Sequence, residues 1–315
     1  MKDNYEREIN YLRLSVTDLC NLRCIYCMPE NGISKLPHEK ILSFEEIEDI
    51  VRTAADFGIT KVRITGGEPL VRKGIEDAVA RINQIPGIND IGITTNGTLL
   101  PEKGQALKDA GVKRINISLD TLNPGKYEEI TRGGKLEDAL KGIQAAKDLG
   151  FEPIKVNVVL MGGINDDEIR DFADFGEKND INIRFIEIMP IGECACWNSD
   201  RFISVEKVLD VLPDLKIEGT DGVSTTYRLP GHKTTIGLIS PISSHFCGEC
   251  NKLRITSDGK LKPCLHSAQE ISLKGLGKDE LKEALRNGIA EKPMNHNLDG
   301  ENASKSIRNM NAIGG

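Results

Sequence analysis

Residues 12–29 have the sequence LRLSVTDLCNLRCIYCMP, and this stretch decides the fold. It begins with alternating apolar and polar residues, as a strand does, and then places Cys20, Cys24 and Cys27 in the loop that follows. In α/β folds, ligands bind in the loops after the strands. In a reducing compartment, closely spaced cysteines indicate a metal site before they indicate disulfides. The stretch therefore predicts an α/β protein with a metal centre at the end of its first strand.

The rhythm of this first unit continues along the chain to about residue 190. Runs rich in β-branched residues alternate with amphipathic stretches, and Ser43 with Glu46 has the spacing of a helix capping box. We expect strands at 11–17, 61–66, 90–95, 114–119, 153–160 and 182–188, and helices at 43–57, 74–84, 102–110, 137–149 and 166–178. Six βα units in series predict a parallel sheet with right-handed crossovers, either open or closed into a partial barrel.

The two faces of the expected strands differ in polarity. One face is apolar, as it must be where helices pack on it. The residues of the opposite face are Arg13, Ser15, Thr17, Lys61, Arg63, Thr65, Thr94, Asn96, Asn116, Ser118, Asp120, Lys155 and Asn157. A doubly wound sheet would be apolar on both faces, and parallel strands rarely leave one face to solvent. The alternation therefore favours a partial (β/α)6 barrel whose lumen is a ligand cavity.

The sequence after residue 190 has a different pattern. Residues 213–265 resemble short strands and turns around the last cysteine group, and residues 278–290 have a helical pattern before a polar tail. We therefore predict a partial-barrel domain at 1–212 and a smaller α+β region at 213–315 that carries a second metal centre.

Composition narrows the classes of function. The formal net charge of −7 argues against a broad nucleic-acid surface. No apolar run approaches the roughly 20 residues that span a bilayer, and the N-terminal residues lack a basic-then-apolar signal segment. We therefore expect a cytoplasmic protein without nucleic-acid or membrane partners. An anionic ligand would need a local cluster of cations.

The first cysteine group has three members, Cys20, Cys24 and Cys27. Three thiolates leave a four-cysteine cluster incomplete, so a [4Fe–4S] cluster held here would keep one iron free for a small molecule. The alternatives are incidental cysteines or a structural zinc site without its fourth ligand, although such zinc sites close with four ligands.

The motifs around this group resemble those of radical S-adenosylmethionine enzymes. The spacing Cys20-x3-Cys24-x2-Cys27 includes the aromatic Tyr26, and GGEP follows the second strand at 66–69. The resemblance implies that the open iron binds the methionine amine and carboxylate of S-adenosylmethionine, whose reduction yields a 5′-deoxyadenosyl radical. The cofactor contacts that it implies are Tyr26, Gly67, Ser118 and Met189.

The second group of three cysteines is Cys247-x2-Cys250-x13-Cys264. By spacing alone it suits zinc, with His266 as a fourth ligand, as well as it suits an iron–sulfur cluster. The two groups together resemble the GTP 3′,8-cyclase family, which begins molybdenum cofactor biosynthesis. The likeness extends over nearly the whole chain, in RITGGEPL, TTNG, RINISLDTL, KVNVVLMGGIND, IRFIEIMP and the terminal Gly-Gly.

This resemblance implies a reaction and a set of partners. The radical removes the ribose 3′-hydrogen of GTP, and the sugar radical adds to guanine C8 to give (8S)-3′,8-cyclo-7,8-dihydroguanosine 5′-triphosphate. A second [4Fe–4S] cluster binds the guanine through its open iron. The expected partners are GTP, an electron donor such as flavodoxin or ferredoxin, and cyclic pyranopterin monophosphate synthase downstream. A homodimer is a further hypothesis.

The resemblance also implies a set of substrate contacts, most of which are basic residues. They are Arg13, Arg63, Thr94, Lys155, Lys252, Leu253 and Arg254, with Lys61, Arg184, Gly314 and Gly315 as secondary candidates. Lys252 departs from the family pattern, which has two arginines spaced by one residue. A lysine keeps the charge but lacks the planar fork, so we expect weaker geometric control at this position.

Two further features raise questions. Arg184 and Met189 are an odd number of residues apart, so a regular strand could not direct both inward, and either a bulge intervenes or Met189 lies past the strand end. Cys194 and Cys196 form a CxC pair, which we interpret as free thiols in a loop because two ligands do not close a metal site.

Two other functions remain as alternatives. One is a different radical S-adenosylmethionine enzyme with an auxiliary cluster, although such enzymes usually carry seven C-terminal cysteines. The other is a non-catalytic zinc-binding protein.

Deletion of Gly314 and Gly315, or a tag fused after them, is expected to abolish turnover, because the resemblance places this tail in the active site. An activity assay on the shortened chain tests this, with the untagged full-length chain as control. Full activity of the shortened chain would refute it.

Overall fold

The structure is a computed structural model that describes residues 1–296, 298 and 304–314. Its centre is a curved sheet whose middle consists of six parallel strands in chain order. They are β1 (Tyr11–Ser15), β2 (Lys61–Thr65), β3 (Asp90–Thr95), β4 (Arg114–Ser118), β5 (Ile154–Leu160) and β6 (Asn182–Glu187). All six predicted strands are therefore present, most of them ending one or two residues earlier than expected.

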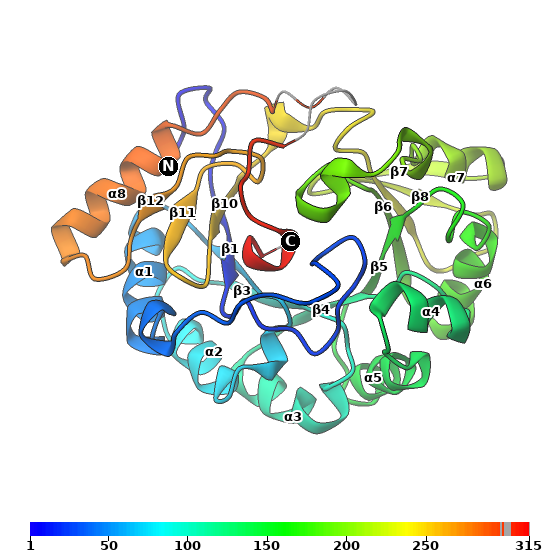
Figure 1. Cartoon of the computed structure of the whole chain (residues 1–315), viewed down its shortest axis with the longest axis horizontal. Coiled ribbons are helices and arrows are strands. Elements are labelled where there is room, and N and C mark those ends of the chain that lie inside the picture. The colour runs from blue at the N-terminus through cyan, green and yellow to red at the C-terminus, as the bar shows by residue number, and fades with distance from the viewer. Residues whose placement is uncertain (297, 299–303, 315) are drawn as a thin grey trace.

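Helices cover the outer face of this sheet, as Figure 1 shows. They are α1 (Phe44–Asp56), α2 (Ile75–Asn83), α3 (Leu100–Ala110), α4 (Pro124–Thr131), α5 (Leu136–Asp148), α6 (Ile169–Asn179) and α7 (Glu206–Val211). The predicted capping box of α1 is confirmed, because Ser43 accepts from the Glu46 amide and Glu46 accepts from the Ser43 amide. The sequence reasoning missed α4, a short helix capped by Asn123 with Pro124 in its first turn.

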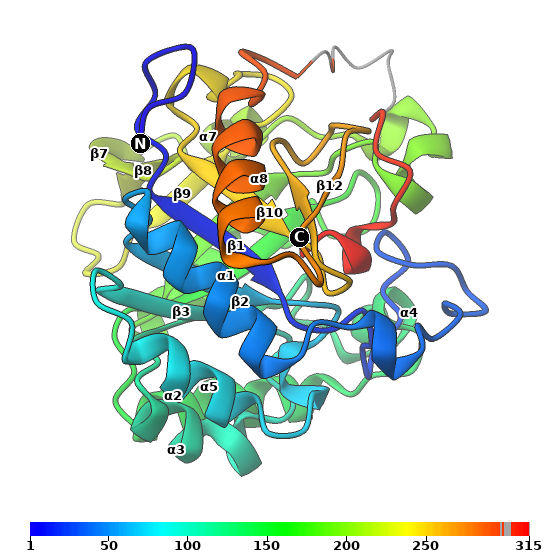
Figure 2. The ribbon, with the colours of Figure 1, turned by 90° about the vertical axis from the view of Figure 1, so that its left-hand side faces the viewer.

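The C-terminal region extends the same sheet at both edges. Its strands are β7 (Lys216–Asp221), β8 (Ser224–Arg228), β9 (Ile236–Ile239), β10 (Lys252–Ile255), β11 (Lys260–Lys262) and β12 (Ile271–Ser272). β10 pairs in parallel with β1, and β9 pairs in parallel with β6. The sheet order runs from β12 to β7, so the barrel is partial. Helix α8 (Lys278–Ala290) packs beside α1 (Figure 2). The boundary at 212/213 stays a prediction.

The polarity of the strand faces follows the prediction. The outward residues of β1 and β4, such as Leu12, Leu14 and Ile117, are fully buried in one core with the helices. The inward residues, such as Arg13, Arg63 and Lys155, line a cavity instead. The lumen of the partial barrel is therefore a cavity whose lining includes charged and polar side chains. No helix in the described part of the chain is both long and apolar enough to cross a membrane.

Candidate functional site

A single cavity of about 430 Å³ occupies the lumen and reaches both groups of three cysteines. This volume is within the usual range for sites that bind small molecules. Its cysteine lining is Cys20, Cys24, Cys27, Cys194, Cys247, Cys250 and Cys264. Two groups more than 200 residues apart in the sequence therefore face the same space.

The strand directions place the two groups at opposite ends of the lumen. The first group follows β1, at the carboxyl end of the strand. Cys250 comes two residues before β10, which runs parallel to β1, and Cys264 comes two residues after β11, which runs antiparallel to β10. The second group is therefore at the amino end of β1, and the five residues of that strand span about 16 Å.

Close backbone approach fixes the loop that carries the first group. The amides of Gly67 and Glu68 donate to the carbonyls of Thr17 and Leu19, both at 2.8 Å. A Cβ on Gly67 would lie 2.4 Å from the Leu19 oxygen and 2.7 Å from the Asp18 oxygen, so no side chain fits there. The paired glycines thus hold the cysteine loop against the end of β2.

The three thiols of the first group lie close enough to affect one another. Burial raises the pKa of Cys20 to about 11 and, with the charges of Cys20 and Cys194, the pKa of Cys27 to about 12. Burial, Asp120 and the two other thiols raise the pKa of Cys24. Such thiols become thiolates only when a positive centre binds them, and binding then releases their protons.

The donor atoms of the first group are three free thiols of one loop. In a [4Fe–4S] cluster each thiolate binds a different iron, so three thiols would leave one iron open. This donor set therefore fits such a cluster. Within the described residues, no three His, Cys, Asp or Glu side chains converge closely enough to hold one metal ion.

Two buried carboxyl groups, those of Glu68 and Asp120, hold the surroundings of the first cysteine group in place. Glu68 accepts from Thr95 Oγ1 at 2.8 Å and from the Asn96 amide at 2.7 Å, and burial raises its pKa to about 7. Asp120 accepts from the Tyr26 hydroxyl at 2.8 Å, and burial raises its pKa to about 6. These bonds fix the ends of β3 and β4 relative to the cysteine loop.

The structure brings together all four residues that the resemblance implied as cofactor contacts. Tyr26, Gly67, Ser118 and Met189 all line the cavity. The parity question is also settled, because β6 ends at Glu187 and Met189 lies past the strand end.

The second group is held by two buried cations. Arg7, which pairs with Asp3 at 2.6 Å, donates to the Cys247 carbonyl at 2.7 Å. Lys292 donates to the carbonyls of Lys252 at 2.9 Å and Pro263 at 3.0 Å, which joins the segments that carry Cys250 and Cys264. Sequence reasoning missed both residues, because nothing local distinguishes them from surface cations.

A row of arginines crosses the lumen between the two groups. Arg13 is the register partner of both Arg254 on β10 and Arg63 on β2. The next position in the row is Gly92, where a Cβ would lie 2.2 Å from the Arg63 guanidinium. The missing side chain therefore provides the space that Arg63 occupies.

Tyr11 was missed by the sequence reasoning and lies beside this row, where its register partners are Lys252 and Lys61. Its hydroxyl accepts from Arg63 Nε at 3.1 Å. Burial alone would raise the pKa of Tyr11, but the charges of Arg63, Arg13 and Lys252 lower it to about 8. Burial and Arg254 lower the pKa of Arg13 to about 9. The row is thus a set of crowded cations that a negative ligand would stabilise.

The remaining predicted substrate residues are distributed unevenly. Thr94 and Lys252 line the cavity, and burial lowers the pKa of Lys252 to about 8. Leu253 is fully buried in the core, so only its backbone could contact a ligand. Among the described residues, Thr94 Oγ1 and Asn157 Oδ1 are buried without a hydrogen-bond partner, as expected for groups awaiting a polar ligand.

Lys155 and Arg184 reach the lumen from β5 and β6, and Lys61 lines it from β2. Both Lys155 Nζ and Arg184 Nη2 donate to one oxygen of Asp221, at the end of β7. Asp221 was not among the predicted site residues, because it comes from an exposed hairpin that has no motif.

The C-terminal tail enters the lumen, as Figure 1 shows. Gly314 is buried, and its carbonyl accepts from Arg13 Nε at 3.2 Å and Arg254 Nη1 at 2.9 Å. A Cβ on Gly314 would lie 2.4 Å from Thr65 Oγ1, so only glycine fits. Gly315 lies outside the described residues. The tail therefore contacts two of the predicted substrate arginines.

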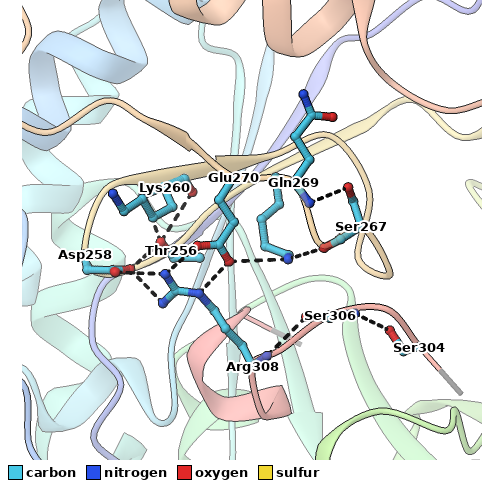
Figure 3. A network of polar contacts seen from close by, with 10 residues as sticks. Thr256, Asp258, Lys260, Ser267, Gln269, Glu270, Ser304, Ser306 and Arg308 are labelled. Carbon is cyan, nitrogen blue, oxygen red and sulfur yellow. Dashed lines mark hydrogen bonds and ion pairs between the residues drawn. The ribbon is translucent and has the colours of Figure 1, made fainter.

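A double ion pair fixes this tail to the rest of the sheet (Figure 3). Arg308 donates two bonds to Asp258, both at 2.9 Å, and two to Glu270, at 2.6 and 2.7 Å. The two carboxylates raise the pKa of Arg308, although burial opposes them, and Arg308 lowers theirs. Arg308 is thus the anchor that aligns Gly314 with the arginine row.

Cys194 departs from the expected loop position. It lies in the short 3-10 helix Gly192–Cys196, is buried, lines the cavity and donates to the Tyr26 carbonyl at 3.2 Å. Cys196 is exposed.

Comparison with known proteins agrees with this geometry. Residues 14–176 match the radical SAM superfamily, and residues 181–298 match the family described as Molybdenum Cofactor Synthesis C. Curated relatives named GTP 3′,8-cyclase include one from Alkaliphilus metalliredigens, 55% identical over 100% of both chains. Another, from Listeria monocytogenes, is 45% identical over 100% of this chain and 99% of its own.

Solved structures of similar fold have low sequence identity. Streptococcus suis SuiB bound to S-adenosylmethionine superposes with a TM-score of 0.63 at 17% identity, over 87% of this chain and 65% of its own. The protein anSMEcpe, with bound AdoMet and a peptide, gives 0.56 at 17% identity, over 89% and 82%. These two structures support the fold.

Gly67→Ala is expected to displace the cysteine loop, because the new methyl group would collide with two carbonyl oxygens. We expect the purified variant to lose about half of its iron, since only the first of the two expected clusters would depend on this loop. Anaerobic iron and sulfide analysis measures this. The control is Gly277→Ala, where the nearest atom lies 3.5 Å from the new Cβ. Full iron content in Gly67→Ala would contradict the account.

Arg308→Met is expected to release the tail and to leave Asp258 without an ion pair, at a cost of ~2 kcal/mol or more in stability. Glu270 keeps its ion pair with Lys262. Adding Asp258→Asn removes the stranded charge, so the double variant should regain thermal stability. Its tail should still be trimmed faster by carboxypeptidase, and its turnover should stay low. A double variant with wild-type turnover would show that the anchor does not position the tail.

Proposed function

The chain belongs to the GTP 3′,8-cyclase family of radical S-adenosylmethionine enzymes, and we propose that its lumen binds GTP between two [4Fe–4S] clusters. The observation that carries the proposal is the single cavity lined by both cysteine groups, with a row of cations between them. The reaction is the conversion of GTP to (8S)-3′,8-cyclo-7,8-dihydroguanosine 5′-triphosphate, the first step of molybdenum cofactor biosynthesis.

Cys20, Cys24 and Cys27 would hold the first cluster. When bound, this cluster and S-adenosylmethionine supply the 5′-deoxyadenosyl radical that removes the ribose 3′-hydrogen. In our proposal, Gly67 receives the methionine end of the cofactor, and Ser118 and Met189 contact its sugar and adenine. The paired glycines contribute by holding the cysteine loop rigidly, because reacting atoms must be aligned within fractions of an ångström.

The substrate would lie along the lumen from the first group to the second. We assign the triphosphate to the cations Arg13, Arg63, Lys155 and Arg184, because phosphate oxygens accept bidentate bonds from arginine. Thr94 Oγ1, buried without a partner among the described residues, has a polar ligand to gain. Burial and then the charge of Arg254 lower the pKa of Arg13, and a bound polyanion would offset both effects.

The guanine would lie at the other end of the lumen. We propose that Cys247, Cys250 and Cys264 hold the second cluster and that its open iron takes the guanine. Lys252 and Arg254 project from β10 beside this group. Lys252 can supply charge here but not a planar fork, which is consistent with our expectation of looser geometric control.

The wider context of the reaction is also proposed. A flavodoxin or ferredoxin would supply the electron, and cyclic pyranopterin monophosphate synthase would consume the product. A cytoplasmic location and a homodimer complete the proposal.

Replacing Cys247, Cys250 and Cys264 together by serine is expected to remove about half of the iron, from about eight to about four per chain. The variant should no longer form cyclised nucleotide when incubated anaerobically with GTP, S-adenosylmethionine and a strong reductant. The matched control is Cys196→Ser, which replaces an exposed cysteine that does not line the cavity and should leave both iron and product unchanged.

Two results would contradict this function. One is zinc instead of iron in the purified wild-type chain. The other is the absence of both 5′-deoxyadenosine and cyclised nucleotide when the wild-type chain holds both clusters.

A further inference from the structure

We propose that Asp221 occupies a phosphate subsite of the cavity and that a triphosphate displaces it on binding. A ligand can therefore enter the subsite only if it binds the two cations more strongly than the carboxylate does. This inference rests on the proposed binding of GTP in the lumen. It concerns a residue of the β7–β8 hairpin, outside the cysteine groups and the arginine row.

The contact that carries the inference is a shared anion. Oδ2 of Asp221 accepts from both Lys155 Nζ and Arg184 Nη2. These cations come from neighbouring parallel strands, where Arg184 is the register partner of Asn157 and Asn182 that of Lys155. One oxygen held between two cations is also the arrangement that an oxygen of a bound phosphate would adopt.

The cations are enclosed, whereas the carboxylate is not. The side chains of Lys155 and Arg184 are 12% and 14% exposed, and that of Asp221 is 40% exposed. Burial and the mutual repulsion of the cations lower the pKa of Lys155. Burial alone would raise the pKa of Asp221, but Arg184 and Lys155 lower it to about 2. The two enclosed cations of the subsite are therefore stabilised by an anion, and in this structure that anion is the Asp221 carboxylate.

The tip of the hairpin that carries Asp221 lies at the edge of the sheet. β7 is the last strand of the sheet and pairs only with β8 among the described strands. Gly219 and Gly222 have positive φ angles, and nothing described lies within 4 Å of a Cβ built on either. Ser224, at the start of β8, is buried, so the loosely packed part is the tip from Gly219 to Gly222. Segments with little packing of this kind open at low cost.

Exchange of the carboxylate for phosphate is favourable for a polyanion. A terminal phosphate carries about −1.5 to −2 charges and three acceptor oxygens, against one charge and two oxygens for Asp221. A ligand that has no phosphate gains nothing from the exchange and leaves Asp221 in place. Asp221 would therefore favour highly charged nucleotides, because less charged ligands cannot offset the free energy needed to break its two ion pairs.

The test compares ligand affinities of Asp221→Asn and wild type, both as anaerobic proteins that hold their clusters. Removing the competing charge should tighten the binding of GTP and of inorganic triphosphate by about tenfold, as expected for loss of a partly buried competing ion pair. Binding of guanosine should not change. The matched control is Glu218→Gln, which removes a carboxylate of the same hairpin that pairs with Arg228 on its outer side.

A second measurement uses only the wild-type protein and so does not depend on the variant's stability. Inorganic triphosphate should speed amide hydrogen exchange at residues 219–224, because displacement frees the hairpin tip. Slower exchange, or weaker GTP binding by Asp221→Asn, would overturn the inference and would indicate that Asp221 helps to hold the substrate, for example through a bound magnesium ion. Unchanged GTP affinity would also overturn it. Failure of wild type to bind GTP at all would instead refute the proposed function.

Discussion

Arg254, Arg13 and Arg63 lie side by side in one register row, and their mutual repulsion inside an enclosed lumen is the constraint that shapes this site. Like charges directly opposite in a sheet are destabilising, so each must be offset. Among the described residues, Tyr11 accepts from Arg63, and the Gly314 carbonyl accepts from Arg13 and Arg254. These acceptors reduce the repulsion, and a polyanionic substrate would reduce it further.

The fold permits this arrangement because the sheet curves around its polar face. Helices bury the outer face in one continuous core, so the stability of the barrel does not depend on an apolar lumen. The C-terminal strands then add functional parts at both edges. On one edge, β10 brings Arg254 and the second cysteine group, and on the other the β7–β8 hairpin brings Asp221. A chain with a negative net charge can thereby concentrate cations inside its lumen.

Sequence reasoning predicted much of this because period-two alternation marks which side chains share a face. The polar residues of β1 to β5 were assigned to the lumen in this way, and both cysteine groups were found by spacing. It could not find partners that depend on distant contacts. Asp221 is 66 residues from Lys155, and Arg308 is 50 residues from Asp258. Leu253 was included as a substrate contact that the resemblance implied, yet strand alternation directs its side chain into the core.

The most direct test of the central claim is an anaerobic crystal structure of the chain with both clusters, S-adenosylmethionine and GTP. We predict that the triphosphate contacts the cations of the lumen and that the guanine faces Cys247, Cys250 and Cys264. The ribose should then lie between the two cysteine groups. A triphosphate bound outside the lumen, or a guanine remote from the second group, would contradict the account.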